Sequence, residues 1–197
     1  MSTTANKQAT NEAKHEESVA TAPYQNPRSD LEPKGPTGKE WKIEFSPVTR
    51  QNVDCIKLLV NKTFPLTYND GLYLRIATEY KDYTFLSYLD DIPVGCIACR
   101  RDQEYQGKNG LYVIILSVLP RYRRGKIGQK MVKEVIERAA KDLTVDFVYL
   151  HTPIKNTTAI NFYEKLGFKK SEELPDYYKS FQGEENTAVI LMYPLTR

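Results

Sequence analysis

The chain has few of the residues on which metal sites and disulfide scaffolds depend. Its 197 residues include three cysteines and two histidines. Cys96 and Cys99 form a C-x-x-C pair, but a zinc site would need a second pair or histidines at suitable spacing, and none follows. A thioredoxin-like motif would begin a helix, whereas this pair lies in a strand pattern. We therefore expect two small buried thiols in a reducing compartment, and no metal site.

Long apolar runs are missing as well. No stretch approaches the length of a membrane span, and the N-terminus has no apolar segment typical of a signal peptide. Residues 1–40 contain no Phe or Trp and little Leu, Ile or Val, so they cannot bury enough apolar surface to become ordered. We expect a disordered tail over 1–40, one domain over 41–197, and a soluble protein located in the cytoplasm or also in the nucleus.

The chain also lacks a strong charge imbalance, since its formal net charge is +3. This balance does not require a nucleic-acid partner. The basic residues nevertheless gather in one short segment, and a local cluster can hold a polyphosphate whatever the net charge. The cluster consists of Arg121, Arg123, Arg124, Lys126 and Lys130.

The basic segment follows the most apolar part of the sequence. Residues 111–119 are nearly all apolar, which is typical of a strand covered on both faces, and Pro120 ends it. Apolar residues then recur every four positions from Ile127 to Ala139, which predicts an amphipathic helix. The first N–H groups of a helix have no internal partner, and the helix dipole favours negative charge there. The segment therefore predicts a site for a phosphate-bearing ligand.

The rest of the chain predicts a mixed α/β domain with one central β-α-β unit over 111–151. Asp90-Asp91 is expected to turn a hairpin, and 101–109 to be a polar loop. Asn69 and Asn156 are expected to begin helices, and Gly167 to end one. Expected strands are 41–45, 83–89, 92–100, 145–151, one from Phe168 and one over 187–193 beyond a turn at Gln182-Gly183; expected helices are 50–63, 70–79 and 156–166.

Two ordered signatures resemble those of GCN5-related N-acetyltransferases (GNAT). Arg123–Gly128 looks like the family's pyrophosphate loop, and 156–168 looks like its N…A…F-Y…G-F helix. The resemblance implies the GNAT fold, with a mixed, mostly antiparallel central sheet, a splayed parallel strand pair and flanking helices. It also implies acetyl-CoA as co-substrate. The cofactor-binding residues would be Leu116, Ser117, Val118, Arg123, Arg124, Gly125, Lys126, Ile127, Gly128, Asn156 and Tyr163.

Residues 41–193 further resemble the San-type N-terminal α-acetyltransferases, the catalytic subunits of NatE. The matching pieces are 64–70, 111–112, 122–124, 149–151 and 177–179. The resemblance implies that Tyr112 and His151 are the catalytic pair. It also implies protein N-termini as substrates, and the NatA auxiliary and catalytic subunits and the ribosome as partners. The substrate pocket would be formed by Phe64, Pro65, Leu66, Tyr68, Ile114, Tyr177 and Tyr178.

The chemistry of acetyl transfer independently requires these residue types. An α-ammonium group has a pKa of about 8, so a general base such as His151 or Tyr112, acting through water, has little to overcome. Backbone N–H groups near 116–118 can stabilise the thioester oxyanion. No Ser or Cys has the context of a nucleophile, so the amine attacks directly. An apolar Phe-Pro-Leu wall favours an N-terminal Met followed by another apolar residue.

Two alternatives remain open. Lys126 stands where the family's loop usually has its middle glycine, and its Cβ can hinder a close approach of the pyrophosphate. A weakly active or non-catalytic GNAT-fold subunit of a ribosome-associated NatA/NatE complex is therefore the second hypothesis. The third is an acetyltransferase for lysines, polyamines or another small amine. Taken singly, His151 and Tyr112 also fit a structural histidine and a core tyrosine.

Overall fold

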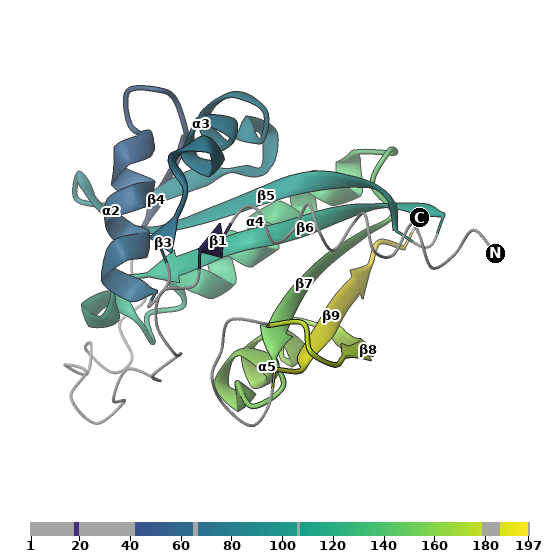
Figure 1. The fold of residues 1–197 in the computed structure, drawn as a ribbon. Coiled ribbons are helices and arrows are strands. Elements are labelled where there is room, and N and C mark those ends of the chain that lie inside the picture. Colours follow the sequence, from purple (N-terminus) through teal and green to yellow (C-terminus); the bar gives the residue numbers. More distant parts are fainter. Residues whose placement is uncertain (1–17, 20–41, 65–66, 106, 179–185, 197) are drawn as a thin grey trace.

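The computed structural model describes residues 18–19, 42–64, 67–105, 107–178 and 186–196. Seven strands form the central sheet in the order β2-β4-β5-β6-β7-β9-β8 (Figure 1). Neighbouring strands run antiparallel except β6 and β7, which are parallel. The expected mixed, mostly antiparallel sheet is therefore confirmed. The strands are β2 Glu44–Pro47, β4 Phe85–Leu89, β5 Ile92–Tyr105, β6 Lys108–Val118, β7 Phe147–Pro153, β8 Lys169–Leu174 and β9 Ala188–Pro194.

Helices cover both faces of this sheet. α2 (Val53–Thr63) and α3 (Asp70–Thr78) share one apolar cluster with Cys96 and Ile115 on one face. α4 (Ile127–Lys141) and α5 (Thr157–Glu164) contribute to a larger cluster on the other face. Two short 3-10 helices, η1 (Lys81–Tyr83) and η2 (Pro120–Tyr122), connect these layers to the strands.

The helix ends lie close to where the sequence predicts them. The side-chain oxygen of Asn69 accepts the backbone N–H of Leu72 at 2.9 Å, and that of Asn156 accepts the N–H of Ala159 at 3.1 Å. Both caps occupy N–H groups that have no partner inside the helix. Gly167 follows α5 with φ +96°, a conformation that costs glycine little.

Two local expectations are wrong. The segment 101–109 was expected to be a loop, but β5 runs to Tyr105 and β6 begins at Lys108, so the two strands form a long hairpin. Arg101 and 107–109 are exposed, which accounts for polar side chains in these strands. The strand expected over 41–45 is observed as Glu44–Pro47, because β2 is an edge strand, where Pro47 is tolerated. The Asp90-Asp91 hairpin is confirmed, with both residues at positive φ.

Most of the predicted tail lies outside the described residues, as do Trp41 and the Gln182-Gly183 turn. Ser18–Val19, however, forms a two-residue strand, β1. It pairs antiparallel with β3 (Thr67–Tyr68), which lies between α2 and α3.

The cysteine prediction is confirmed, because Cys96 and Cys99 are both buried thiols in β5. None of the described helices is long and apolar enough to cross a membrane. In the same part of the chain, no group of three or more His, Cys, Asp or Glu side chains is arranged to hold a metal ion.

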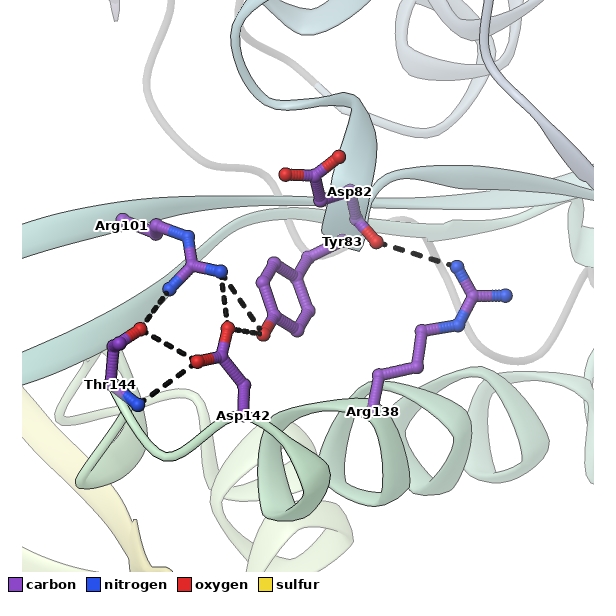
Figure 2. A network of polar contacts seen from close by, with 6 residues as sticks. All are labelled: Asp82, Tyr83, Arg101, Arg138, Asp142 and Thr144. Atoms are coloured by element: carbon purple, nitrogen blue, oxygen red, sulfur yellow. Dashed lines mark hydrogen bonds and ion pairs between the residues drawn. The ribbon is translucent and has the colours of Figure 1, made fainter.

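A polar network joins the end of α4 to β5 and η1 (Figure 2). The Asp142 carboxylate accepts hydrogen bonds from the Tyr83 hydroxyl at 2.7 Å and from the Thr144 hydroxyl and backbone N–H at 2.6 and 2.9 Å. Arg101 forms an ion pair with the same carboxylate. Hydrogen bonds from Thr144, Tyr83 and Arg101 hold the pKa of Asp142 well below its usual range.

We predict that Asp142→Asn lowers the free energy of unfolding by about 1.5 kcal/mol at pH 7, because it weakens several bonds to a charged acceptor. A carboxyl whose pKa is depressed on folding stabilises the protein above its unfolded pKa, and this contribution is lost as the pH falls below about 4. The difference in free energy of unfolding between wild type and variant, measured in urea, should therefore be smaller at pH 3 than at pH 7. An equal difference at both pH values would show that the charge of the Asp142 carboxylate does not contribute to stability.

Candidate active site

The site lies where β6 and β7 separate. The strands pair through Gly110↔Phe147, Leu111↔Val148 and Tyr112↔Tyr149, and no further. Beyond Tyr112, β6 continues along β5, whereas β7 continues along β9 towards α5, so the two strands diverge (Figure 1). Alternate backbone N–H groups of 113–118 therefore face away from β5 and towards the opening. The expected splayed parallel pair is confirmed.

Tyr112 and His151 meet at the start of this opening. Their ring centroids are 5.3 Å apart, and Tyr149 contacts both rings, at 5.1 and 5.9 Å. Because side chains alternate along a strand, Tyr112 projects from the face opposite to its neighbours Leu111 and Val113, which belong to the α4 cluster. The pair therefore lies on the α2/α3 side of the sheet.

The predicted substrate residues surround the same opening. His151 stacks on Tyr177 with centroids 4.7 Å apart and an interplanar angle of 12°, and Tyr177 contacts Tyr178 at 5.0 Å. Tyr178 in turn lies within electrostatic range of Tyr68. Phe64, Tyr68 and Ile114 pack against the α2/α3 cluster, whereas Pro65 and Leu66 lie outside the described residues. The structure thus brings Tyr177 and Tyr178 to the predicted catalytic pair, with Tyr68 on the other side of Tyr178.

Burial raises the pKa of Tyr112 well above its ordinary value, and the neighbouring tyrosines add to this effect. The Arg100 guanidinium, 5.0 Å from the Tyr112 ring centroid, opposes the rise. The phenol is therefore protonated at neutral pH. It can donate a hydrogen bond, while His151 is the better proton acceptor.

Three residues beside Tyr112 were missed by the sequence reasoning. The Asp102 carboxylate accepts the Arg100 Nε–H at 2.8 Å on one oxygen and the Tyr149 hydroxyl on the other. Arg100 and Tyr149 flank Tyr112 from β5 and β7, so a single carboxylate holds both neighbours of the ring. Arg100, a charged residue within an apolar strand, was the available signal. Because 101–109 was expected to be a loop, no partner could be assigned to it.

The basic loop connects the end of β6 to α4. The Arg123 Nε–H donates to the Val118 carbonyl at 3.0 Å, which holds the loop against the strand. Helical bonding begins with Lys130 N–H to Lys126 carbonyl, so the N–H groups of 127–129 form the open first turn. The predicted cofactor loop 123–128 and the strand residues 116–118 therefore adjoin one another. This arrangement suits a ligand that carries a diphosphate in one part and an acyl group in another.

The predicted residues on α5 have structural roles as well. The side-chain oxygen of Asn156 caps the helix. Tyr163 is buried in the α4/α5 cluster, 5.2 Å from the Phe168 ring centroid, and burial raises its pKa. Gly128 faces the Phe162 ring, 3.5 Å from where a Cβ would lie. α5 therefore packs directly against the start of α4.

Lys126, rather than Gly125, adopts the left-handed conformation in the loop, with φ 61° and ψ 8°. Arg124 also has positive φ, at 66°. A side chain with a Cβ is strained in this region by about 1 kcal/mol, which explains on physical grounds why glycine suits position 126. The departure from the family's pattern is thus a lysine in a glycine-like conformation.

We predict that Lys126→Gly raises the free energy of unfolding by about 1 kcal/mol, because it relieves this strain. The control is Lys133→Gly, at an exposed position inside α4, which should lower it by about 1 kcal/mol. Urea unfolding at equilibrium measures both. A loss of stability in Lys126→Gly would show that the lysine side chain offsets its own strain.

A sheet that opens between two parallel strands, with a basic loop at the following helix, defines an acyl-CoA-binding acyltransferase fold. Residues 54–168 match the acetyltransferase (GNAT) family, and the chain belongs to that family.

Comparison with individual proteins shows which members of this family the chain resembles. The chain is 40% identical over 141 residues to N-alpha-acetyltransferase 50 of Danio rerio, covering 72% of this chain and 83% of that protein. It is 36% identical over 140 residues to the probable N-acetyltransferase san of Drosophila melanogaster, covering 71% and 75%. Among solved structures it resembles Arabidopsis thaliana Naa50 in complex with the bisubstrate analogue CoA-Ac-MVNAL, with a TM-score of 0.68, 30% identity, and coverage of 77% and 97%.

Proposed function

We propose that this chain is an N-terminal α-acetyltransferase that moves an acetyl group from acetyl-CoA to Met-initiated, apolar protein N-termini. The observation that carries the proposal is the Tyr112–His151 contact at the point where β6 and β7 part, beside the stacked Tyr177. In this proposal the thioester reaches the point from the side of the basic loop and the amine from the side of Tyr177 and Tyr178. Holding the two reactants in contact contributes a large part of the acceleration.

Acetyl transfer here is a direct displacement. The neutral α-amine attacks the thioester carbonyl carbon, the new N–C bond forms, and the C–S bond breaks. N–H groups of β6 near 116–118 stabilise the negative charge on the carbonyl oxygen. The amine proton passes to His151, directly or through water, and is then delivered to the departing sulfur, so that CoA leaves as a thiol. Tyr112, which remains protonated, orients the amine or the water by hydrogen bonding.

The first residue of the substrate would lie against Phe64, Tyr68 and Ile114. These side chains pack against one apolar cluster, so a Met side chain there exchanges water for apolar contact. The Arabidopsis relative's analogue, CoA-Ac-MVNAL, also begins with Met and Val, which supports the same preference.

The test is acetyl transfer from acetyl-CoA to peptides beginning Met-Leu and Ser, with an N-terminally blocked Met-Leu peptide and a free polyamine as competitors. We expect turnover on Met-Leu and little on Ser. Activity on the blocked peptide through an internal lysine, or on the polyamine, would instead identify a side-chain or small-amine acetyltransferase. No turnover on any substrate would overturn the proposal.

Lys126 favours a second candidate, a weakly active GNAT-fold subunit of a cytoplasmic, ribosome-associated NatA/NatE assembly. Its strained backbone lies in the loop that would hold the diphosphate. Calorimetric titration with acetyl-CoA of wild type and Lys126→Gly separates the two. Micromolar binding by wild type supports the enzyme, whereas binding that appears only in the glycine variant supports the non-catalytic subunit.

A further inference from the structure

A chain of hydroxyl and thiol groups crosses from α2 to the central sheet beneath the site. The Thr63 Oγ1 lies 2.8 Å from the Ser117 Oγ, and Thr63 also bonds the Leu59 carbonyl at 2.8 Å. A hydroxyl has one proton, and a carbonyl can only accept. Thr63 therefore donates to Leu59, and Ser117 donates to Thr63.

Cys96 extends the chain into the neighbouring strand. It lies opposite Ser117 in the β5–β6 register and is hydrogen-bonded to that hydroxyl. Burial raises the pKa of the thiol to about 12, so it keeps its proton at neutral pH, and the contact with the Ser117 hydroxyl opposes this rise. The Thr63 and Ser117 hydroxyls thus each have a hydrogen-bond partner, which a buried polar group needs.

The two hydroxyl residues belong to different halves of the proposed site. Thr63 is the last residue of α2 and directly precedes Phe64. Phe64 and Tyr68, which are predicted to contact the substrate peptide, are called the peptide wall below. Ser117 is 2% exposed, and its backbone belongs to the segment 116–118 beside the opening between β6 and β7. Cys96, beside Ser117, belongs to one apolar cluster with Val60 and Ile115. Apolar contacts alone are non-directional, whereas a hydrogen bond fixes the distance and angle between the two elements.

We propose that Thr63 and Ser117 are positioning residues for acetyl transfer: their hydrogen bond fixes the peptide wall relative to the strand that carries the thioester. This inference rests on the proposed function. Loss of the bond lets the end of α2 shift against β6, and small displacements of reacting groups lower the rate strongly. The effect should appear in kcat for the peptide reaction, because neither hydroxyl needs to touch acetyl-CoA.

The experiment compares Thr63→Val, Ser117→Ala and the double variant with wild type, using Met-Leu peptide and saturating acetyl-CoA. We expect each single variant to lower kcat about tenfold, with the KM for acetyl-CoA within twofold of wild type. The double variant should be no worse than either single one, because both remove the same bond. Thr63→Ser, which keeps the hydroxyl, should restore kcat.

Thr78→Val is the matched control, because Thr78 also bonds the carbonyl four residues earlier at 2.8 Å, but on α3. Its kcat should equal that of wild type. Unchanged kcat in both Thr63→Val and Ser117→Ala, or additive losses in the double variant, would overturn the inference. So would failure of Thr63→Ser to recover activity while its melting temperature is normal.

A second measurement keeps the inference separable from the proposed function. Amide hydrogen exchange of 59–64, without cofactor, should be about tenfold faster in Ser117→Ala than in wild type and unchanged in Thr78→Val. If wild type acetylates no peptide but exchange still accelerates, the proposed function fails while the coupling of α2 to β6 stands. Equal exchange in Ser117→Ala and wild type would overturn the coupling even in an active enzyme.

Discussion

Tyr112→Phe and His151→Ala should each lower kcat for acetylation of a Met-Leu peptide by about 10²-fold. The phenol hydroxyl and the imidazole are the groups that handle the amine proton in the proposed reaction, while binding of both substrates depends on other residues. The KM for acetyl-CoA should therefore change little. Steady-state kinetics with acetyl-CoA and peptide varied independently measure both constants.

The phenylalanine ring keeps the Tyr112 contacts with Tyr149 and the Arg100 guanidinium, so the melting temperature should stay within a few degrees of wild type. Tyr88→Phe is the matched control, since Tyr88 is a partly buried tyrosine on β4, separated from β6 by β5. It should retain full turnover. If both Tyr112→Phe and His151→Ala keep kcat within threefold of wild type, the two side chains contribute to packing and not to proton transfer.

Asp102→Ala should lower the free energy of unfolding by about 3 kcal/mol, because it removes a carboxylate that pairs with a buried guanidinium. The Arg100 side chain is 9% exposed, and its Nε lies 2.8 Å from Asp102. The same substitution removes the acceptor of the Tyr149 hydroxyl. Urea unfolding monitored by circular dichroism gives the value.

The partly buried ion pair between Glu134 and Arg138, one turn apart on α4, provides the comparison, and Glu134→Ala should cost under about 0.5 kcal/mol. The double variant Arg100→Met/Asp102→Leu should recover most of the stability lost in Asp102→Ala, because no charge is left buried. A loss below about 1 kcal/mol in Asp102→Ala would show that water or another group compensates Arg100.

The sequence was most informative where one local signal determines the backbone. The Asn69 and Asn156 caps, the Asp90-Asp91 turn and the Gly167 helix end each act within a few residues, and all four lie where they were predicted. The parallel β6–β7 pair followed from the apolar strands on either side of a single amphipathic helix.

Contacts between distant residues were not accessible in this way. Asp102 meets Tyr149 only because β5, β6 and β7 are neighbours, and 47 positions separate the two residues along the chain. Thr63 and Ser117 are 54 positions apart. The positive φ of Lys126 was equally hidden, because a basic residue next to glycine gives no sign of which one adopts the left-handed conformation. These features depend on tertiary packing rather than on local propensity.

The short contact between β6 and β7 also has a consequence for how the chain folds. The sheet consists of two groups of strands on either side of this contact. In the first, β4, β5 and β6 are neighbours in sequence and pair antiparallel. In the second, β9 pairs antiparallel with both β7 and β8. The first group, β4–β6, can form from contacts close in sequence. The β6–β7 contact joins Tyr112 to Tyr149 through three residue pairs only, whereas β7 and β9, which are as far apart in sequence, pair from Phe147↔Pro194 to Pro153↔Ala188. The β4–β6 group should therefore gain protection first during refolding, and the β6–β7 contact, where the site lies, should form last because it closes a long loop with few residue pairs.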